Sequence, residues 1–247
     1  MTTPWRAWAP LLLALVLFFV LATYQLTLPG LHYDEAKEAG INAMQLVRDQ
    51  PLTAFRGASV SLFGRAWPLM VQDYIGTLNV YLALPFLTLG GITVPALRLL
   101  SVACGLLTLL FLFLFARRWF SARVAGAAVL LLAVNPSFVF WSRQGIFVTN
   151  VTLTLFLASL WTLLRAGDAP NNRRRWGWLA VTGWLWGVGL WTKLLFIWGI
   201  VAVVGVITVI AVTRWWRRGR MGHGYAFHWR TGLTSLAVVM LALALWA

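Results

Sequence analysis

Residues 9–35 read APLLLALVLFFVLATYQLTLPGLHYDE, and this stretch decides the fold. Positions 9–28 carry no charged side chain and are followed by Pro29 and Gly30. A membrane-spanning helix needs about 20 consecutive apolar residues, and proline and glycine end helices. We therefore predict a first span at Ala9–Leu28. The sequence Val20-Leu21-Ala22 also fits a signal-peptidase site, but the apolar run exceeds the usual core of about 7–15 residues, which favours an uncleaved anchor.

The composition of the chain agrees with a membrane protein. Of its 247 residues, 61% are hydrophobic and 11% are charged. Soluble domains average about 25% charged residues, so lipid must cover most of this surface. The net charge of +14 would suit nucleic acid, but most arginines lie in short clusters between apolar runs, where they orient membrane helices. We expect the lipid bilayer as a partner and no nucleic acid.

Six further apolar runs follow the first span. The block 176–213 is interrupted only by Lys193 and, as one helix, would be about 57 Å long, against about 30 Å for a bilayer, so we predict two helices with a turn at Lys193. The expected fold is all-α: a polytopic membrane protein of about seven transmembrane helices in a single domain over residues 1–247. That domain has the first span at 9–28, an external loop with interfacial helices at 29–95 and the remaining spans in 96–247. The later spans are expected at Ala96–Ala116, Val124–Phe140, Phe147–Leu164, Trp176–Thr192, Leu194–Thr213 and Gly232–Ala247.

One apolar segment, Tyr74–Ile92, could span a membrane but contains Asn79, Pro85 and a Gly-Gly pair. The distribution of basic residues argues against a crossing. If the segment stays at the surface, 13 of the 20 basic residues fall on the cytoplasmic side, as the positive-inside rule requires. These 13 residues are Arg6, Arg117, Arg118, Arg123, Arg165, Arg173, Arg174, Arg175, Arg214, Arg217, Arg218, Arg220 and Arg230. We therefore predict an interfacial or re-entrant helix and a cytoplasmic N-terminus.

Five of the six acidic residues precede the Ala96 run, on the side predicted to be external. Glu38 and Asp49 fit an amphipathic helix, where solvation explains them. Asp34 and Glu35 differ, because they come where the first span leaves the bilayer. Placing a carboxylate at that depth costs free energy, so one found there is a candidate for a function. It could accept a proton or hold a metal ion.

Two cations are expected at the same face. Arg143 ends the third predicted span, and Lys193 lies at the turn between the fifth and sixth. Each could simply extend toward the interface from a helix end. Together with Asp34 and Glu35, however, they suit a lipid head group that carries phosphate, because arginine and lysine bind phosphate well.

Four stretches resemble one family, the C-fold-type polytopic glycosyltransferases that include protein mannosyltransferases and lipid A aminoarabinose transferases. The order of the stretches and the predicted topology agree with that family over most of the chain, from Pro10 to Thr213. The four stretches are His32–Glu35, Asp73–Gly76 through Pro85-Phe86 to the Ala96–Leu99 sequence ALRL, Asn135-Pro136 with Trp141–Arg143, and Leu190–Lys193.

This resemblance implies an inverting transfer of a sugar from a polyprenyl-phosphate-linked donor to a hydroxyl of a protein or lipid acceptor. Asp34 would be the general base and Glu35 its neighbour in the motif. Arg143 and Lys193 would bind the donor phosphate and stabilise it as leaving group. Candidates for supporting roles are Asp73, His32 and Tyr74. No cofactor is implied with certainty, and the need for a divalent metal is left open.

Family members are around twice as long, and the chain stops inside an apolar run at Trp246-Ala247. We therefore expect it to be incomplete at its C-terminal side. Two alternatives stay open: a non-enzymatic membrane subunit or inactive remnant, and a transporter or flippase of a lipid-linked substrate. The expected location is the plasma (inner) membrane, with the site on the external or periplasmic face.

Overall fold

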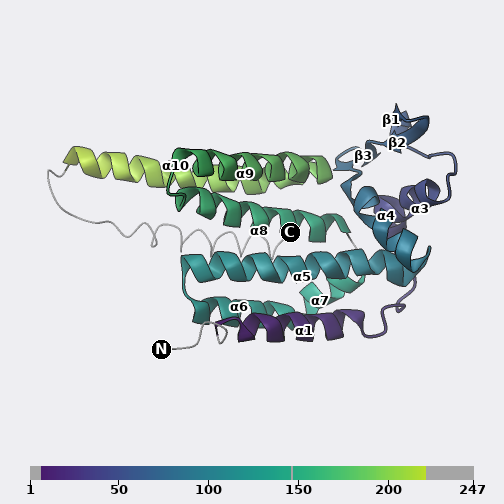
Figure 1. The fold of residues 1–247 in the computed structure, drawn as a ribbon, viewed down its shortest axis with the longest axis horizontal. Coiled ribbons are helices and arrows are strands. Elements are labelled where there is room, and N and C mark those ends of the chain that lie inside the picture. The colour runs from purple at the N-terminus through teal and green to yellow at the C-terminus, as the bar shows by residue number, and fades with distance from the viewer. Residues whose placement is uncertain (1–6, 146, 221–247) are drawn as a thin grey trace. The chain divides into compact units, whose positions relative to one another are not determined.

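The computed structural model describes residues 7–145 and 147–220, which are mostly helical (Figure 1). The chain divides into two compact units, one ending at Phe196 and the other beginning at Ile197. The second unit contains one described helix, α10 (Ile197–Arg220). All of the candidate site residues belong to the first unit.

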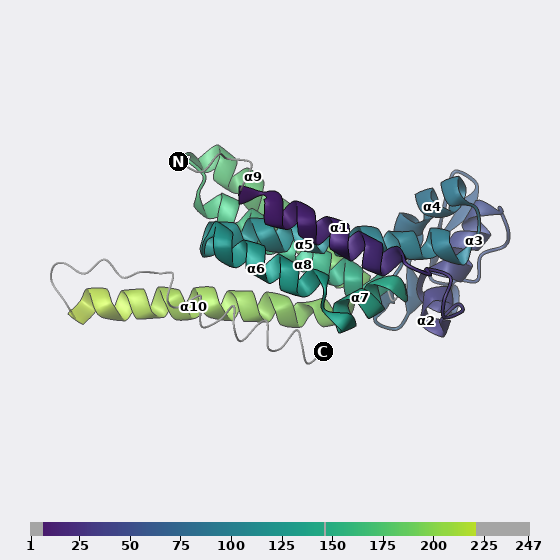
Figure 2. The same ribbon diagram turned by 90° about the horizontal axis from the view of Figure 1, so that it is seen from below.

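The first unit is built on a bundle of long helices that run side by side in both views (Figures 1 and 2). Polar side chains start several of them by accepting a backbone N–H: Thr93 for α5, Ser121 for α6 and Asn171 for α9. The bundle helices are α1 (Ala9–Thr23), α5 (Val94–Trp119), α6 (Ala122–Ala133), α8 (Phe147–Gly167) and α9 (Asn172–Thr192).

Small residues and paired hydroxyls hold these helices together. A Cβ added at Gly105 of α5 would lie 2.3 Å from Cζ of Phe18 in α1, so the two helices meet where the glycine leaves room. The Thr108 and Thr154 hydroxyls are 2.8 Å apart between α5 and α8. Inside an apolar bundle, the two hydroxyls form a hydrogen bond with each other, which lipid could not provide.

The third predicted span, Val124–Phe140, is not one straight helix. It consists of α6 and α7 (Pro136–Arg143), which meet at an angle of 59°. Pro136 has no backbone N–H to continue α6, and the Asn135 side chain caps the new helix by accepting from Phe138 N at 3.0 Å. The bend brings Arg143 back toward the end of α1.

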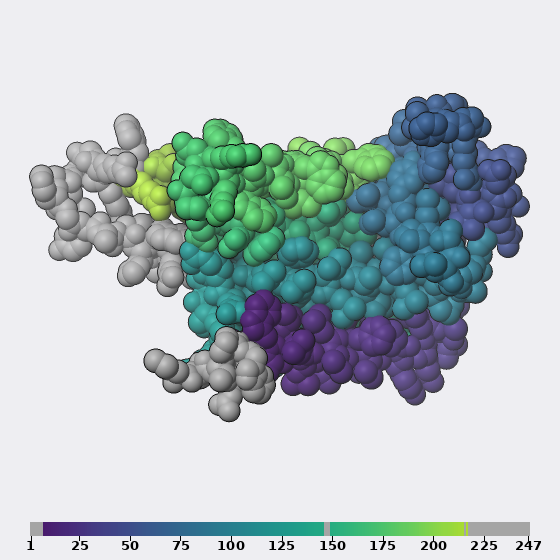
Figure 3. Space-filling model, viewed as in Figure 1, coloured from purple at the N-terminus to yellow at the C-terminus, as the bar shows by residue number. Residues whose placement is uncertain are grey.

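The loop after α1 covers one end of the bundle, and its atoms form a continuous blue cap in Figure 3. It contains the short α2 (Tyr33–Glu35), the π-helical turn η2 (Ala36–Gly40), α3 (Ile41–Val47), the 3-10 turn η3 (Phe55–Gly57) and α4 (Leu78–Gly90). Two antiparallel hairpins lie among them, and the all-α prediction did not include either. They pair β1 (Ser59–Leu62) with β2 (Arg65–Pro68), and β3 (Met70–Gln72) with β4 (Ile75–Gly76).

Helix α4 occupies most of the segment predicted to be interfacial. Its 13 residues make about 20 Å at 1.5 Å per residue, less than a bilayer core of about 30 Å. Its buried side, including Val80 and Ala83, packs with Ala43 of α3 and Leu97 of α5 in one core. The prediction of a non-crossing helix agrees with this length.

By length and composition, two of the described helices could each cross a membrane: Val94–Trp119 and Leu194–Arg214. A third crossing is added if α6 and α7 form one bent span. The chain is thus a membrane protein with apolar spans, while the number of seven stays a prediction. The expected break at Lys193 is present, because Lys193 is extended between α9 and the 3-10 turn η4 (Leu194–Phe196). The span expected at Gly232–Ala247 lies outside the described residues.

Candidate functional site

The turn that carries Asp34 and Glu35 is fixed by reciprocal hydrogen bonds. The His32 Nδ1 accepts from Asp34 N at 3.2 Å, and the Glu35 carboxylate accepts from His32 N at 3.0 Å. This is the capping-box arrangement, in which two backbone donors at a helix start are satisfied by side chains. His32 therefore has a structural role in the turn. Its supporting role in the reaction stays a prediction.

Glu35 is buried in an ion pair with Arg98 of α5, and neither side chain is exposed. Arg98 Nε donates to Oε1 at 2.9 Å and Nη2 donates to Oε2 at 3.2 Å. The same guanidinium donates to the carbonyls of Leu26 at 2.6 Å and Gly30 at 2.9 Å. A buried charge pair is tolerated when its remaining donors are also satisfied, and Arg98 meets this condition.

Asp34 has the opposite environment. Its side chain is 39% exposed, and the His32 imidazole is its one ion-pair neighbour within the described residues, at 3.8 Å. Because Glu35 is fixed against Arg98, the adjacent Asp34 is held at the surface of the same turn. Of the two carboxylates, Asp34 is the one that is accessible at the surface of the fold.

Arg143 contacts the chain that leaves α1. Its Nη2 donates to the carbonyls of Tyr24 at 2.6 Å and Gln25 at 2.8 Å. Its Nε is buried and has no hydrogen-bond partner within the part of the chain that the structure describes. An unpaired N–H on a guanidinium is costly unless another acceptor satisfies it. Arg98 and Arg143 thus both hold the 24–30 segment by donating to its carbonyls.

Gly145, two residues after Arg143, lies against Glu35, the partner of Arg98. Its φ is 68°, in the region that favours glycine, and a Cβ added there would lie 2.8 Å from Glu35 Oε1. The turn after α7 therefore contacts the Glu35 carboxylate directly. The first and third motifs of the sequence, which are more than 100 residues apart, meet at this point.

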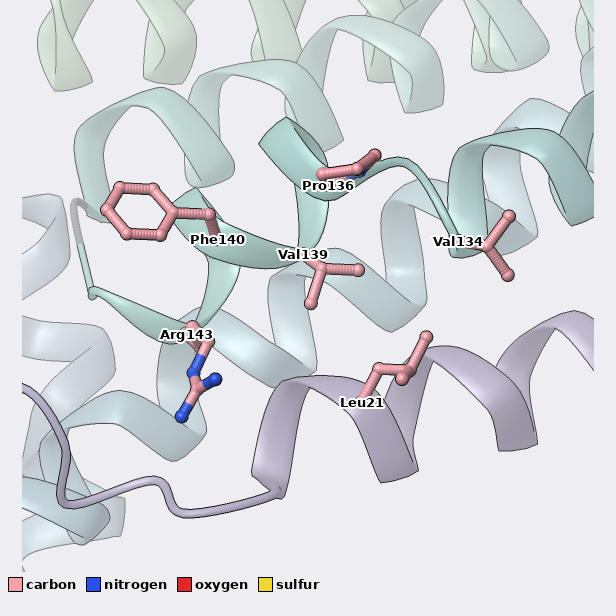
Figure 4. A pocket seen from close by; sticks show the side chains of 6 residues that line it. All are labelled: Leu21, Val134, Pro136, Val139, Phe140 and Arg143. Atoms are coloured by element: carbon pink, nitrogen blue, oxygen red, sulfur yellow. The ribbon is translucent and has the colours of Figure 1, made fainter.

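A hollow of about 250 Å³ lies between the end of α1 and the α6–α7 bend. Figure 4 shows Arg143 at one end of it, with its guanidinium directed toward the chain leaving α1. The rest of the lining is apolar. The lining residues are Leu21, Val134, Pro136, Val139, Phe140 and Arg143.

Lys193 lies at the other cation position, after α9, and its backbone forms an antiparallel bridge with Ile75 of β4. Tyr74 is exposed beside this bridge, and its carbonyl accepts from Leu194 N at 2.9 Å. Asp73 is paired with Arg56 at 3.0 Å in an exposed ion pair. The structure therefore brings Tyr74 next to Lys193, while Glu35 lies beside the turn that follows Arg143.

Arg98 is the site residue that the sequence interpretation missed. The ALRL stretch of the resemblance contains it, but the sequence interpretation gave its side chain no role. The available signal was its place inside the apolar run that begins at Ala96, because an arginine within a span needs a carboxylate partner. Glu38 was also misinterpreted as a solvated charge: it is buried, with 6% of its surface exposed.

The opposite end of the bundle carries Arg117, Arg118 and Arg165 together with the sixth acidic residue, Asp168. There, Arg118 donates from Nε to the Asp168 carboxylate at 2.6 Å. This hydrogen bond holds the pKa of Asp168 below its usual value, although partial burial opposes the effect. Within the described residues, no group of three histidine, cysteine or acidic side chains is placed to hold a metal ion.

Comparison with known proteins decides the family. Residues 76–246 match the model of the dolichyl-phosphate-mannose-protein mannosyltransferase family. The chain belongs to this family. The mannosyltransferase resemblance drawn from the four motifs is thereby confirmed, and with it membership of the polyprenyl-phosphate-dependent glycosyltransferases of the C fold type.

The fold of this mannosyltransferase-family chain is similar to a solved structure, that of ArnT from Cupriavidus metallidurans bound to undecaprenyl phosphate. The TM-score is 0.58 at 22% sequence identity, and the match covers 98% of this chain. It covers 41% of the ArnT chain, so the present chain spans less than half the length of that protein. A search of curated proteins gave no match.

Proposed function

We propose that this chain is part of a membrane glycosyltransferase that moves a sugar from a polyprenyl-phosphate donor to an acceptor hydroxyl, with inversion. The observation that carries the proposal is the contrast between Asp34 and Glu35. One carboxylate is exposed beside His32, and the other is locked in a buried pair with Arg98. This contrast supports Asp34 as the general base and Glu35 as the residue that holds the turn.

In this reaction the acceptor oxygen attacks the anomeric carbon from the face opposite the phosphate. Its proton passes to the Asp34 carboxylate as the bond to the phosphate oxygen breaks. Inversion follows because the sugar undergoes one displacement. Asp34 needs no cation in contact with it, since a close positive charge would make the carboxylate a weaker base.

The leaving phosphate needs positive charge. Arg143 supports this role through its buried Nε, which has no hydrogen-bond partner among the described residues, and through the apolar hollow beside it. A lipid phosphate joins an anionic group to a hydrocarbon chain, and the hollow offers a matching cation and apolar wall. Lys193 is the second proposed phosphate ligand, and its backbone bridges Ile75 of the loop after α1. Preformed cations at the site of developing charge are typically the largest catalytic contribution in such sites.

The family supports a donor of this class, and ArnT, whose fold is similar, was solved with undecaprenyl phosphate bound. The proposed acceptor is a protein or lipid hydroxyl. We place the protein in the plasma (inner) membrane as a single domain with a cytoplasmic N-terminus. The site then faces the external or periplasmic side, because the arginine-rich turns lie at the opposite end of the bundle.

The experiment that tests the function is Asp34→Asn in the whole membrane-embedded protein. The amide keeps the shape of the side chain but cannot accept the proton. We expect turnover to fall by a factor of about 10² or more while binding of the polyprenyl-phosphate donor is largely retained. Asp49→Asn serves as a matched control, because that carboxylate is exposed and paired with Arg65. Full activity in Asp34→Asn would contradict the proposed base.

A further inference from the structure

The β3–β4 hairpin of the first loop is attached to the end of α9 at the backbone of Lys193. Ile75 and Lys193 form an antiparallel bridge, and Leu194 N donates to the Tyr74 carbonyl at 2.9 Å. Lys193 has φ −154° and ψ 123°, so its backbone is extended where α9 has just ended. The hairpin thus supplies the strand against which Lys193 pairs.

Two further contacts surround this bridge. The Trp191 indole Nε1 donates to the Leu69 carbonyl at 3.1 Å, directly before β3. Gly76 of β4 lies so close to α9 that an added Cβ would be 2.1 Å from the Trp191 carbonyl oxygen and 2.7 Å from Cδ1 of its ring. A backbone oxygen at that distance cannot move aside cheaply. Any side chain at position 76 must therefore push the hairpin away from α9.

The start of α4, which directly follows β4, is fixed to the end of β2. The Thr77 and Tyr81 hydroxyls both donate to the Pro68 carbonyl, at 2.8 Å for Thr77. The Tyr81 ring lies 6.1 Å from the Trp191 ring and 6.0 Å from the Trp67 ring, measured between centroids. The Tyr81 ring therefore packs near both Trp67 of β2 and Trp191 of α9. These aromatic contacts stabilise the attachment of the loop to α9.

We infer that the Met70–Gly76 hairpin positions the Lys193 side chain for the donor phosphate, with Gly76 and Trp191 as positioning residues. The inference rests on the proposed function of Lys193. Gly76 follows Ile75, the bridge partner of Lys193, and Trp191 lies two residues before Lys193 in the chain. A shift of the hairpin would therefore move the amine without removing it.

A double-mutant cycle tests this, with binding of undecaprenyl phosphate to the whole detergent-purified protein as the readout. We expect Lys193→Ala and Gly76→Ala each to weaken binding by about tenfold or more. The double variant should bind no more weakly than Lys193→Ala alone, because Gly76 acts through Lys193. The control is Gly183→Ala on the same helix α9, where an added Cβ meets nothing within 4 Å.

A milder variant keeps the test valid if Gly76→Ala does not fold. Trp191→Phe retains an aromatic ring and removes the N–H donated to Leu69. We expect weaker binding of undecaprenyl phosphate, and again no added loss on the Lys193→Ala background. Its control is Trp184→Phe, at an exposed tryptophan of the same helix.

The outcomes separate the inference from the function it rests on. If Lys193→Ala binds normally, the phosphate role of Lys193 is wrong, and thiol labelling of Lys193→Cys decides the positioning: a labelling rate unchanged by Gly76→Ala would overturn it. If Lys193→Ala weakens binding but Gly76→Ala and Trp191→Phe do not, the hairpin does not position the lysine. Fully additive losses in the cycle would overturn the inference in the same way.

Discussion

Glu35 and Arg98 are 63 residues apart in the chain and form a buried ion pair with a shortest N–O distance of 2.9 Å. The pair joins the turn after α1 to the start of α5. It also fixes Asp34 at the surface, because the two acidic residues are consecutive in the same turn. The stability of this turn and the availability of the proposed base therefore have a common origin.

Removing one member of the pair should destabilise the protein strongly. Glu35→Gln or Arg98→Met leaves a buried group without its partner, and such changes cost about 3–5 kcal/mol. The double variant should recover part of the loss, since neither charge is then buried alone. Thermal unfolding of the purified protein measures this. Arg56→Ala is the control, because its pair with Asp73 is exposed and should contribute less than about 1 kcal/mol. Equal losses in both pairs would contradict the interpretation.

Gly145→Ala should lower both stability and activity. Alanine is strained at a φ of 68°, and its Cβ would meet the Glu35 carboxylate. We expect a loss of about 1–3 kcal/mol in the free energy of unfolding. Gly177→Ala in α9 is the matched control, since an added Cβ there meets nothing within 4 Å. An unchanged melting temperature in Gly145→Ala would show that the turn relaxes away from Glu35.

The Asp34 carboxylate should lie roughly 6–12 Å from both the Arg143 and Lys193 cations, because a sugar phosphate must fit between base and leaving-group site. An experimental structure with undecaprenyl phosphate bound measures these distances. In kinetics, Arg143→Ala and Lys193→Ala should each cost about 2–4 kcal/mol, divided between donor binding and turnover. Arg143→Ala should also lower stability, since its Nη2 holds the Tyr24 and Gln25 carbonyls. Asp34 on the opposite side of the bundle from both cations would remove the basis of the mechanism.

Labelling of introduced cysteines should report opposite sides of the membrane at the two ends of the first unit. Phe63→Cys, at the fully exposed tip between β1 and β2, should react with an impermeant external reagent. Arg174→Cys, at the start of α9, should react only after the membrane is opened. External labelling at position 174 would reverse the orientation and remove the site from the external face.

The Arg118–Asp168 pair predicts a small pH dependence of stability. Arg118 lowers the pKa of Asp168 in the folded state, so the pair stabilises the fold above the unfolded pKa. That contribution is lost as the pH falls through the folded pKa. Both side chains are partly exposed, so we expect less than about 1 kcal/mol. The melting temperature of Asp168→Asn should lie slightly below that of the natural chain at pH 7, and the difference should disappear in acid. A constant difference at all pH values would contradict the assignment.

The sequence by itself determined the membrane class, most helix positions and the family. Apolar runs long enough to span a bilayer require lipid around them, and the helix break at Lys193 followed from length alone. The short motifs named the family because they keep their order along the chain. The 59° bend was not predicted, although Asn135-Pro136 was visible, because a proline can bend a span or begin a new helix.

Only the tertiary structure decided how Asp34 and Glu35 differ. Consecutive residues of a helical turn point about 100° apart, so one can face the bundle while the other faces solvent. Their order along the chain does not say which one does. The choice depends on Arg98 and on the close approach of Gly145, both of which come from distant segments. A buried carboxylate needs a buried cation to offset its desolvation, and packing alone brings that cation to Glu35.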